Sequence, residues 1–361
     1  MKNIYRSIIF IAAAIVAASC AKVVIENSND ADQRYFKAWL IENGYSDLKP
    51  LWNGVELSKE DADKYNGIYQ ISNDEGTGTA VTKDGFAIME FTAYDLEGNI
   101  TEYTDSVTAV QLGEYDPSAY YGPEVWLTYD EAIPAGVLNA LIGMKTGGSK
   151  KVIIPSWFMT YSVLDSPKDY FEKKSDMTHS IYEFTVKGFT TDISKWEIES
   201  IGNHIIKEFG SLNAFSNDTT GFYFRNRKPY SSNAVEFPKD TTIYINYTGK
   251  LLNGLVFDTT VEKTAKDNNI YSSSREYAPV MIKFGATNGE IKMGSDETEV
   301  IPGFSRTISK MKYNPKEPNW KDSVIGIFES SQGYGYAGSG ASIPAYAPLI
   351  FEIEVVDKPA E

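Results

Sequence analysis

The sequence predicts an α+β protein with two related domains, each an antiparallel twisted sheet wrapped on a short helix, and a linker helix between them. Three observations point to this fold class. At 361 residues the chain is long enough for two or three domains. Aromatic residues make up 13% of it, with 24 Tyr, which is typical of strand-rich structure. Finally, a series of short motifs occurs twice in the same order.

The first 19 residues predict an export signal. Lys2 and Arg6 give a positive start, and the apolar segment from Ile8 to Ala18 is too short to span a bilayer. Cys20, the only cysteine, comes directly after it. This arrangement resembles a bacterial lipobox, which implies that Cys20 is lipidated and attaches the chain to a membrane. The alternative is an ordinary secretory signal and an incidental cysteine.

Residues 20–65 form the predicted lipidated N-terminal segment, and they contain one predicted helix. Over residues 31–43 the pattern places Phe36, Trp39 and Leu40 on one face, and Gly44 ends it. With one cysteine in the chain no internal disulfide can form, so the domains must be held together by their apolar cores.

The repeated motifs define the two domains. The first set begins at Gly67-Ile68-Tyr69 and the second at Gly221-Phe222-Tyr223. The later pairs are Phe91-Thr92-Ala93 with Tyr247-Thr248-Gly249, Ile133-Pro134 with Ile301-Pro302, and Ile181–Phe184 with Ile350–Ile353. We therefore predict a first domain at 66–190 and a second at 218–361. Between them, residues 191–217 predict a linker helix, because apolar residues recur at helical spacing and Gly210 closes the pattern.

The second domain carries a longer series of motifs. In order they are Ile245–Leu251, Gly254–Asp258, Glu299–Phe304, Gly333–Gly335, Ser342–Pro344 and Leu349–Val355. Their order and approximate spacing resemble the FK506-binding-protein (FKBP) family of peptidyl-prolyl cis-trans isomerases. The resemblance implies two FKBP-like domains, of which the first is degenerate and the second is the isomerase domain.

The resemblance also implies a set of pocket residues. Walls, rim, floor and hydrogen-bond donors would come from Tyr247, Phe257, Asp258, Val300, Ile301, Phe304, Tyr334, Ile343 and Phe351. Isomerisation needs an apolar cup for the proline ring and directed hydrogen bonds to the twisted amide, and it needs no nucleophile. Taken singly, each of these residues also fits ordinary core packing. Together they favour a pocket.

Several features depart from the family pattern. Phe304 stands where Trp is commonest, and Val280 stands where another wall aromatic is usual. Extra residues occupy 263–276, 286–298 and 314–321. In the first domain Phe91 takes the position of Tyr247, and the Phe-Asp pair and the Tyr334 loop have no counterpart. We expect reduced activity in the second domain and none in the first.

Composition and motif context exclude other classes of function. The net charge of −15 argues against nucleic-acid binding. His179 and His204 are far apart, so no metal site is expected, and no cofactor is expected either. Gly333–Gly338 satisfies G-x-G-x-x-G, but Pro344 comes too soon after it for the helix that a dinucleotide site requires.

The expected function is peptidyl-prolyl cis-trans isomerisation that assists folding of exported proteins at the bacterial cell envelope. Proline-containing protein clients and an FK506-type macrolide are the expected ligands. The expected location is the outer membrane or a periplasmic face, by lipid anchor. One alternative is an FKBP-like lipoprotein that binds a protein partner without turnover. Another is a surface lipoprotein that holds glycans through exposed aromatic side chains.

Overall fold

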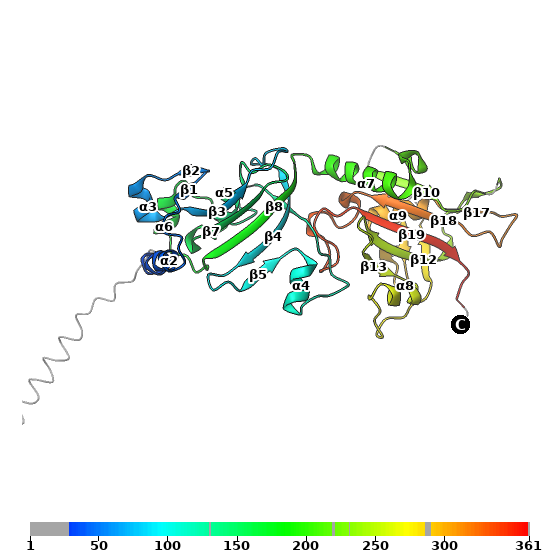
Figure 1. The fold of residues 1–361 in the computed structure, drawn as a ribbon. Coiled ribbons are helices and arrows are strands. Elements are labelled where there is room, and N and C mark those ends of the chain that lie inside the picture. Colours follow the sequence, from blue (N-terminus) through cyan, green and yellow to red (C-terminus); the bar gives the residue numbers. More distant parts are fainter. Residues whose placement is uncertain (1–28, 130, 219–220, 231, 286–289, 360–361) are drawn as a thin grey trace, which may run out of the picture.

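The computed structural model describes residues 29–359, apart from 130, 219–220, 231 and 286–289. The predicted signal at 1–19 and Cys20 lie outside the described residues. The α+β fold class is confirmed, because the described strands pair antiparallel and short helices pack on their sheets. Two sheet units lie side by side, with α7 (Ile193–Phe209) packed on one face of the second sheet (Figure 1). No helix among the described residues has the length and apolar character that a membrane crossing requires.

The first unit contains an eight-stranded sheet in the order β2-β1-β3-β7-β8-β4-β5, with β6 paired to β4. Its strands are β1 (Pro50–Trp52), β2 (Val55–Glu56), β3 (Ile68–Asp74), β4 (Phe86–Tyr94), β5 (Ile100–Tyr103), β6 (Glu124–Leu127), β7 (Ser149–Ile154) and β8 (Ser180–Thr190). Its helices are α2 (Asp30–Glu42), α3 (Lys59–Tyr65), α4 (Ser106–Leu112), α5 (Ala135–Leu141) and α6 (Pro167–Glu172).

The second unit contains a nine-stranded sheet in the order β16-β15-β14-β12-β19-β18-β10-β9, with β13 paired to β12, and a separate β11-β17 pair. Its strands are β9 (Ser216–Asn217), β10 (Phe222–Asn226), β11 (Val235–Glu236), β12 (Thr242–Leu251), β13 (Val256–Thr259), β14 (Val280–Phe284), β15 (Ile291–Met293), β16 (Thr298–Glu299), β17 (Lys312–Tyr313), β18 (Ser323–Phe328) and β19 (Leu349–Val356). Its helices are α8 (Glu262–Asp267) and α9 (Pro302–Ser309).

The two sheets share their central connectivity. The first runs β3-β7-β8-β4 and the second β10-β18-β19-β12, and corresponding strands hold corresponding places in the sequence. In each unit a short strand pairs back on the long one, β5 on β4 and β13 on β12. A short helix that starts at an Ile-Pro pair, α5 or α9, precedes the next central strand. The division of the chain at the stated boundaries stays a prediction, but the motif repeat coincides with this shared topology.

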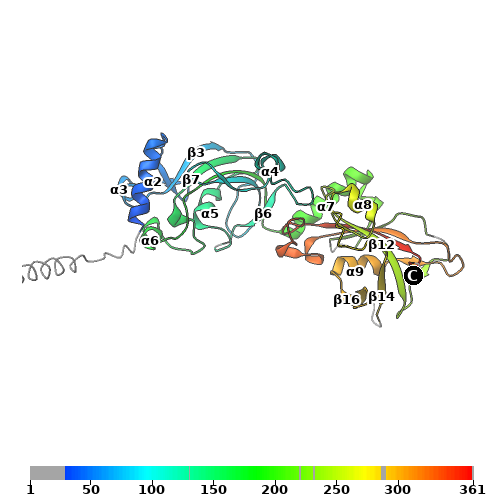
Figure 2. The ribbon, with the colours of Figure 1, turned by 90° about the horizontal axis from the view of Figure 1, so that it is seen from below.

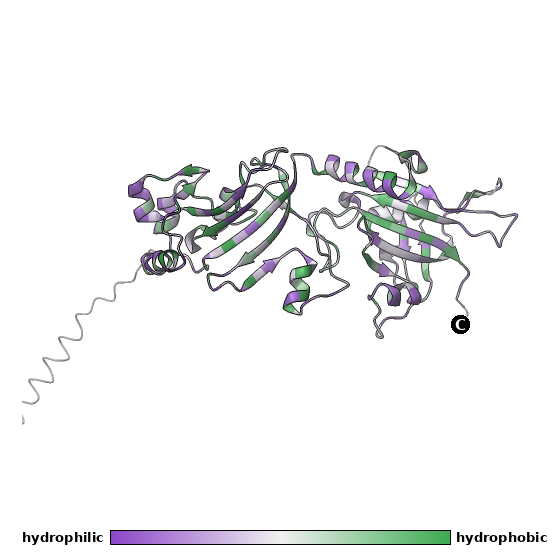
Figure 3. Cartoon of the chain, viewed as in Figure 1, coloured by the Kyte–Doolittle hydropathy of each residue, from purple (hydrophilic) through white to green (hydrophobic). Residues whose placement is uncertain are grey.

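Strand periodicity explains where the second core lies. Along β12, Ile243, Ile245 and Tyr247 are buried while the residues between them are partly exposed. Successive side chains of a strand point to opposite faces, so one face of β12 packs inward on α9. The alternation of hydrophobic and hydrophilic residues along the central strands is visible in Figure 3. Full burial of each such side chain stabilises the fold by roughly 1.5–3 kcal/mol.

The N-terminal segment does not stand apart from the first unit. Phe36 and Leu40 of α2 are buried in the same core as β3, β7 and β8. Phe36 stacks on His179 with ring centroids 4.8 Å apart. Strand β1 extends the sheet by pairing Leu51 with Ile68. The predicted boundary at residue 66 therefore does not separate two cores.

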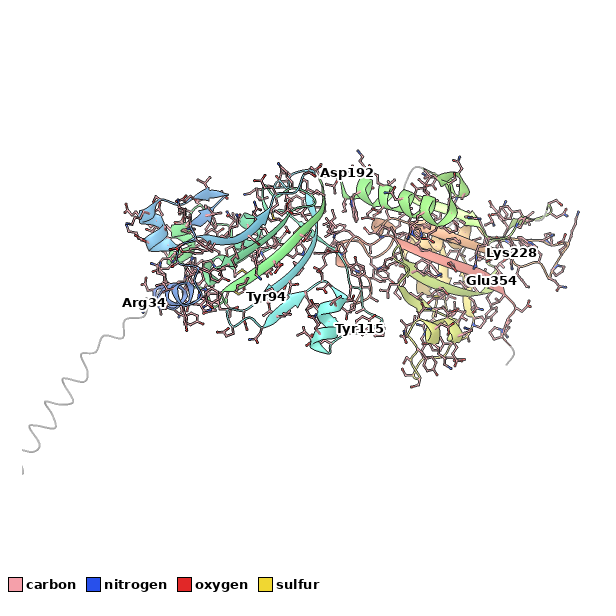
Figure 4. The ribbon with its side chains drawn as sticks, viewed as in Figure 1. Arg34, Tyr94, Tyr115, Asp192, Lys228 and Glu354 are labelled. Carbon is pink, nitrogen blue, oxygen red and sulfur yellow. The ribbon has the colours of Figure 1, made fainter. Side chains whose placement is uncertain are left out.

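Helix α7 is more than a connection between the units. Its Ile201 and Ile205 are fully buried against Tyr223 of β10 and other residues on the outer face of the second sheet. The helix begins where the Asp192 side chain accepts a hydrogen bond from the Lys195 amide, at the junction visible in Figure 4. The second sheet starts at β9, two residues before the predicted start at 218.

Candidate active site

Three buried aromatic rings meet between β12, α9 and β19. The ring centroids of Tyr247 and Phe304 are 5.3 Å apart, those of Phe304 and Phe351 are 4.9 Å apart, and those of Tyr247 and Phe351 are 6.1 Å apart. Their exposed fractions are 7%, 3% and 4%, respectively. Edge-to-face and tilted packing at these distances is favourable for aromatic pairs. The three rings form a rigid apolar base, which we call the aromatic cup.

Two glycines allow the rings to approach one another. Gly249 of β12 pairs with Phe351, and a Cβ there would lie 2.5 Å from the Phe257 ring. A Cβ on Gly303 would lie 2.3 Å from the Phe328 ring of β18. Since both spaces are filled by aromatic side chains, α9 sits close on the sheet and presents Phe304 to the cup.

Apolar side chains surround the aromatic cup. Phe257 packs on Phe351 with centroids 5.7 Å apart. Val300, Ile301 and Ile343 pack against the same core, and of these Ile343 is the buried one. Ile301 comes directly before α9, with Pro302 at the first helical position, so the N–H of Ile301 lies outside the hydrogen-bond ladder of the helix.

Polar groups lie at the rim. The hydroxyl of Tyr247 donates to the Asp258 carboxylate at 2.6 Å, and Arg275 donates to the same carboxylate. Burial and the negative charge of Asp258 raise the pKa of Tyr247 and also that of Tyr334. Both phenols therefore stay protonated at neutral pH. Tyr334 is 38% exposed, so its hydroxyl is the more accessible donor of the two.

Seven of the nine predicted pocket residues pack in one core; Asp258 is joined to it by its hydrogen bond with Tyr247, and Tyr334 lies near enough to Asp258 to feel its charge. The buried ones are Tyr247, Phe304, Ile343 and Phe351, the half-buried ones are Phe257, Asp258, Val300 and Ile301, and Tyr334 is exposed. Val280 of β14 is partly buried against the same core. An apolar base with donors and an acceptor at its rim can bind a proline ring and direct hydrogen bonds to its amide. The roles of the individual residues in catalysis stay a prediction.

Sequence reasoning missed Arg275. It lies in the insertion at 263–276, where Tyr271 stacks on Tyr277, the residue after the insertion, with centroids 5.4 Å apart. The Arg275 guanidinium lies 5.4 Å from the Tyr277 ring and reaches Asp258. A lone arginine among tyrosines shortly after Asp258 was the available signal, but sequence alone does not show which way the insertion folds.

Among its described residues, the first unit fills the corresponding positions with different side chains. Phe91 of β4 packs on Trp126 at 4.6 Å and on Tyr182 at 6.1 Å. Val137 of α5, at 1% exposure, lies where α9 presents Phe304. The segment 155–179 comes directly after β7, in the same place in the chain as the Tyr334 loop after β18. It contributes Trp157 to the core under α2. In the first unit this segment is part of the core.

The histidines and the glycine motif singled out in the sequence lie in ordinary packing and turn structure where the structure describes them. Within the described ranges, no group of three or more His, Cys, Asp and Glu is arranged to hold a metal ion. Burial lowers the pKa of His179 to about 4, and its Nδ1 accepts a hydrogen bond from the Ser156 amide at 2.9 Å. The glycines at 333–338 lie in and beside two short 3₁₀ turns, η3 (Ser330–Gln332) and η4 (Gly335–Ala337).

The segment that contains the aromatic cup is similar to known proteins. Residues 234–356 match the family model of the FKBP-type peptidyl-prolyl cis-trans isomerases. The chain is 25% identical over 244 residues to a probable FKBP-type peptidyl-prolyl cis-trans isomerase of Haemophilus influenzae, covering 64% of this chain and 86% of that protein. It is 30% identical over 115 residues to the FKBP-type 22 kDa peptidyl-prolyl cis-trans isomerase of Escherichia coli, covering 32% and 40%.

A solved structure also matches part of the chain. It is the crystal structure of a peptidyl-prolyl cis-trans isomerase from Pseudomonas syringae, at 18% identity and a TM-score of 0.29, covering 46% of this chain and 96% of that one.

Proposed function

We propose, from the premise that residues 234–356 belong to the FKBP-type peptidyl-prolyl cis-trans isomerase family, that the second unit catalyses cis–trans isomerisation of X-Pro peptide bonds. The observation that carries the proposal is the aromatic cup of Tyr247, Phe304 and Phe351, with Asp258 and Tyr334 at its rim. The family membership supplies the reaction, and the cup supplies a place for the proline ring.

The chemistry is dictated by the amide barrier. Rotation about an X-Pro bond must break amide resonance, at a cost of about 18–20 kcal/mol. The cup would hold the ring by apolar contact while the N–H of Ile301 and the hydroxyl of Tyr334 donate to carbonyl oxygens of the bound peptide. A twisted amide has lost its resonance, so donors placed to fit that geometry lower the barrier. Asp258, held by Tyr247 and Arg275, fixes the wall from which these contacts are made.

The clients we propose are exported proteins with accessible prolines, met at the bacterial cell envelope. The support is the predicted signal at 1–19 and the lipobox-like position of Cys20. Lipidation of Cys20 would hold the chain on a membrane surface. An FK506-type macrolide is the proposed inhibitor, because in the FKBP family such macrolides bind an aromatic pocket of this kind.

An isomerisation assay on the full chain tests the proposal. The protein should accelerate cis–trans isomerisation of a proline peptide, which takes on the order of tens to hundreds of seconds when uncatalysed. FK506 should inhibit this activity by competing with the peptide. Phe257→Ala removes a wall of the cup and should lower kcat/KM by roughly tenfold or more. The matched control is Phe237→Ala, which truncates a partly buried Phe on the same core whose ring neighbours, Phe284 and Tyr313, lie outside the cup.

The second candidate is a binder without turnover. The smaller Phe304 floor and the folded insertion at 263–276 favour it, because both change how a peptide seats at the cup. Saturable peptide or FK506 binding with no acceleration of any proline peptide would establish this alternative and reject the enzyme. Loss of both binding and catalysis in Phe257→Ala, but not in Phe237→Ala, would place either function at the cup.

A further inference from the structure

The loop of residues 329–348 carries two of the predicted site residues, Tyr334 and Ile343. It lies between the two sheets in both views (Figures 1 and 2). A small β-bridge joins Ser339 and Ile343, with the Ser339 amide donating to the Ile343 carbonyl at 2.8 Å. Ala341 is at the tip of this bridge, so whatever holds Ala341 also holds Ile343.

A residue of the first unit holds that tip. The backbone N–H of Tyr120 donates to the carbonyl of Ala341 at 2.8 Å. The Tyr120 ring packs against the core cluster of the second unit, although Tyr120 lies between α4 and β6 of the first. Tyr120 therefore contacts the second unit through both its amide and its ring.

Tyr120 is fixed in place by its own loop. Its hydroxyl donates to the Pro123 carbonyl at 2.9 Å, and the Gly122 amide donates to the Thr104 carbonyl at 2.8 Å. Gly122 has φ +151°, and a Cβ at that position would lie 2.8 Å from the Tyr120 hydroxyl oxygen. Because these contacts are internal to the first unit, it presents Tyr120 in one orientation.

Two further contacts hold the ends of the loop. Near its end, Tyr346 packs edge-on against Phe86 of β4 with centroids 5.3 Å apart. Tyr346 has φ +57°, a left-handed conformation that persists in a Tyr only when surrounding contacts hold it. At the start of the loop, Glu197 of α7, at 2% exposure, accepts hydrogen bonds from the amide and from the hydroxyl of Ser330, the latter at 2.7 Å.

We propose that the first unit, together with α7, positions the loop 329–348, and that Tyr120 is a positioning residue for the site of the second unit. The contact at Ala341 sets where Ile343 lies against the aromatic cup, and the contacts at Ser330 and Tyr346 set where the loop presents Tyr334. The first unit thereby supports the site of the second. The effect of this contact on catalysis rests on the proposed function, whereas the positioning of the loop does not.

The test measures loop order and catalysis together in the full chain. Tyr120→Ala removes the ring contact with the second unit and loosens the donor at residue 120. Amide hydrogen exchange at residues 334–346 should accelerate by about five- to tenfold, with exchange in β18 and β19 unchanged. For a proline peptide, KM should rise roughly three- to tenfold with little change in kcat, because the loop orders at the moment of binding.

The matched control is Tyr115→Ala. Tyr115 lies in the same loop as Tyr120, beyond the end of α4 (Figure 4), is 49% exposed, and stacks on Tyr121 within the first unit at 5.5 Å. The Tyr115→Ala variant should show the same amide exchange at 334–346 and the same isomerisation kinetics as the wild type. Unchanged exchange at 334–346 in Tyr120→Ala would overturn the proposal.

A second variant approaches the contact from the other side. Tyr346→Gly removes the ring that meets Phe86, while glycine accepts φ +57° without strain. If Tyr120→Ala speeds amide exchange throughout the first sheet, the first unit has itself been destabilised, and the Tyr346→Gly result is used instead. Faster exchange at 334–346 in Tyr346→Gly then supports the proposal, and unchanged exchange rejects it. A wild-type chain without isomerase activity would contradict the proposed function, yet the exchange comparison would still decide whether the first unit holds the loop.

Discussion

Tyr334 and Tyr247 both have phenol side chains near Asp258, but their surroundings give them different roles. Tyr247 is buried and its hydroxyl is already committed to the Asp258 carboxylate. Tyr334 is more than a third exposed, and burial together with Asp258 raises its pKa. A buried, paired hydroxyl holds the wall in place, whereas an exposed, protonated one is available to a peptide.

Tyr334→Phe should therefore lower catalysis without affecting the fold. It deletes one hydroxyl, and a donor directed at the bound peptide contributes about 1–3 kcal/mol to transition-state binding, so kcat/KM should fall several-fold to about a hundredfold. Tyr336→Phe is the matched control in the same loop, since Tyr336 is 76% exposed. Isomerisation kinetics and thermal unfolding check both variants. Equal activity of Tyr334→Phe and wild type would remove Tyr334 from the mechanism.

Phe304→Trp should raise affinity for FK506-type macrolides, because a larger ring broadens the floor of the aromatic cup. Phe304 is 3% exposed and packs on both Tyr247 and Phe351, so the extra volume should also cost roughly 1–3 kcal/mol of stability. Calorimetric titration with FK506 and chemical unfolding measure the two effects. A folded Phe304→Trp variant that binds no more tightly would show that the floor does not limit binding.

At the scale of elements, the close approach of α9 to β18 brings Phe304 into contact with the other two rings of the aromatic cup. Gly303→Ala would place a methyl group within 2.3 Å of the Phe328 ring, and we expect a loss of about 1–3 kcal/mol in the free energy of unfolding. Gly202→Ala on α7 is the control, because its new methyl would meet only Leu212 at 3.8 Å. That change should be neutral or stabilise by up to about 1 kcal/mol. Chemical unfolding of both variants checks the contrast, and equal effects would contradict it.

The contact between α7 and the loop at 329–348 should depend on pH. Burial, with the nearby Glu329 carboxylate adding to it, raises the pKa of Glu197 to about 7 despite its hydrogen bonds from Ser330. A carboxyl whose folded pKa exceeds its unfolded value adds stability at low pH, and that stability is lost as pH rises toward the folded pKa. The protein should therefore unfold at a lower temperature at pH 8 than at pH 5.

Glu197→Gln should reduce this dependence, because the amide keeps an acceptor for Ser330 and carries no charge. The share of Glu197 should be on the order of 1–3 kcal/mol between about pH 5 and 8. Thermal unfolding of wild type and variant at several pH values gives the comparison. If both chains show the same pH dependence, the Glu197 carboxyl is not the group responsible.

At the scale of the whole molecule, two units of shared topology differ in the segments that come after their corresponding strands. After β18 the chain forms the loop that carries Tyr334 and Ile343, whereas after β7 it forms the packing of Trp157 under α2. The second unit holds the aromatic cup, and the first contacts the loop 329–348 through Tyr120 and Phe86.

Cys20→Ser tests the proposed attachment of the whole chain. If Cys20 is lipidated, wild-type protein should fractionate with membranes and take up acyl label. The variant should move to the soluble envelope fraction, because no anchor would then hold it. Membrane fractionation with labelling in the native host checks this. Unlabelled wild type with the same fractionation as the variant would refute the lipid anchor.

The sequence by itself determined the fold class, the repeated motifs and the composition of the cup. Strand alternation and helical spacing are local patterns, and for that reason the helix at 193–209 and the long strand with Tyr247 could be predicted from neighbouring residues. The series Gly254–Asp258, Glu299–Phe304 and Ser342–Pro344 pointed to residues that the structure gathers around α9.

Only the tertiary structure decided which distant segments share a core. The pairing of Arg275 with Asp258, the burial of Phe36 beside His179 and the hydrogen bond from Tyr120 to Ala341 each join segments whose approach no local pattern encodes. Their physical basis is long-range: burial of apolar surface chooses which segments meet, and polar groups then pair because leaving them unpaired in a dry interior costs free energy. The support of the second unit's site by the first belongs to this class.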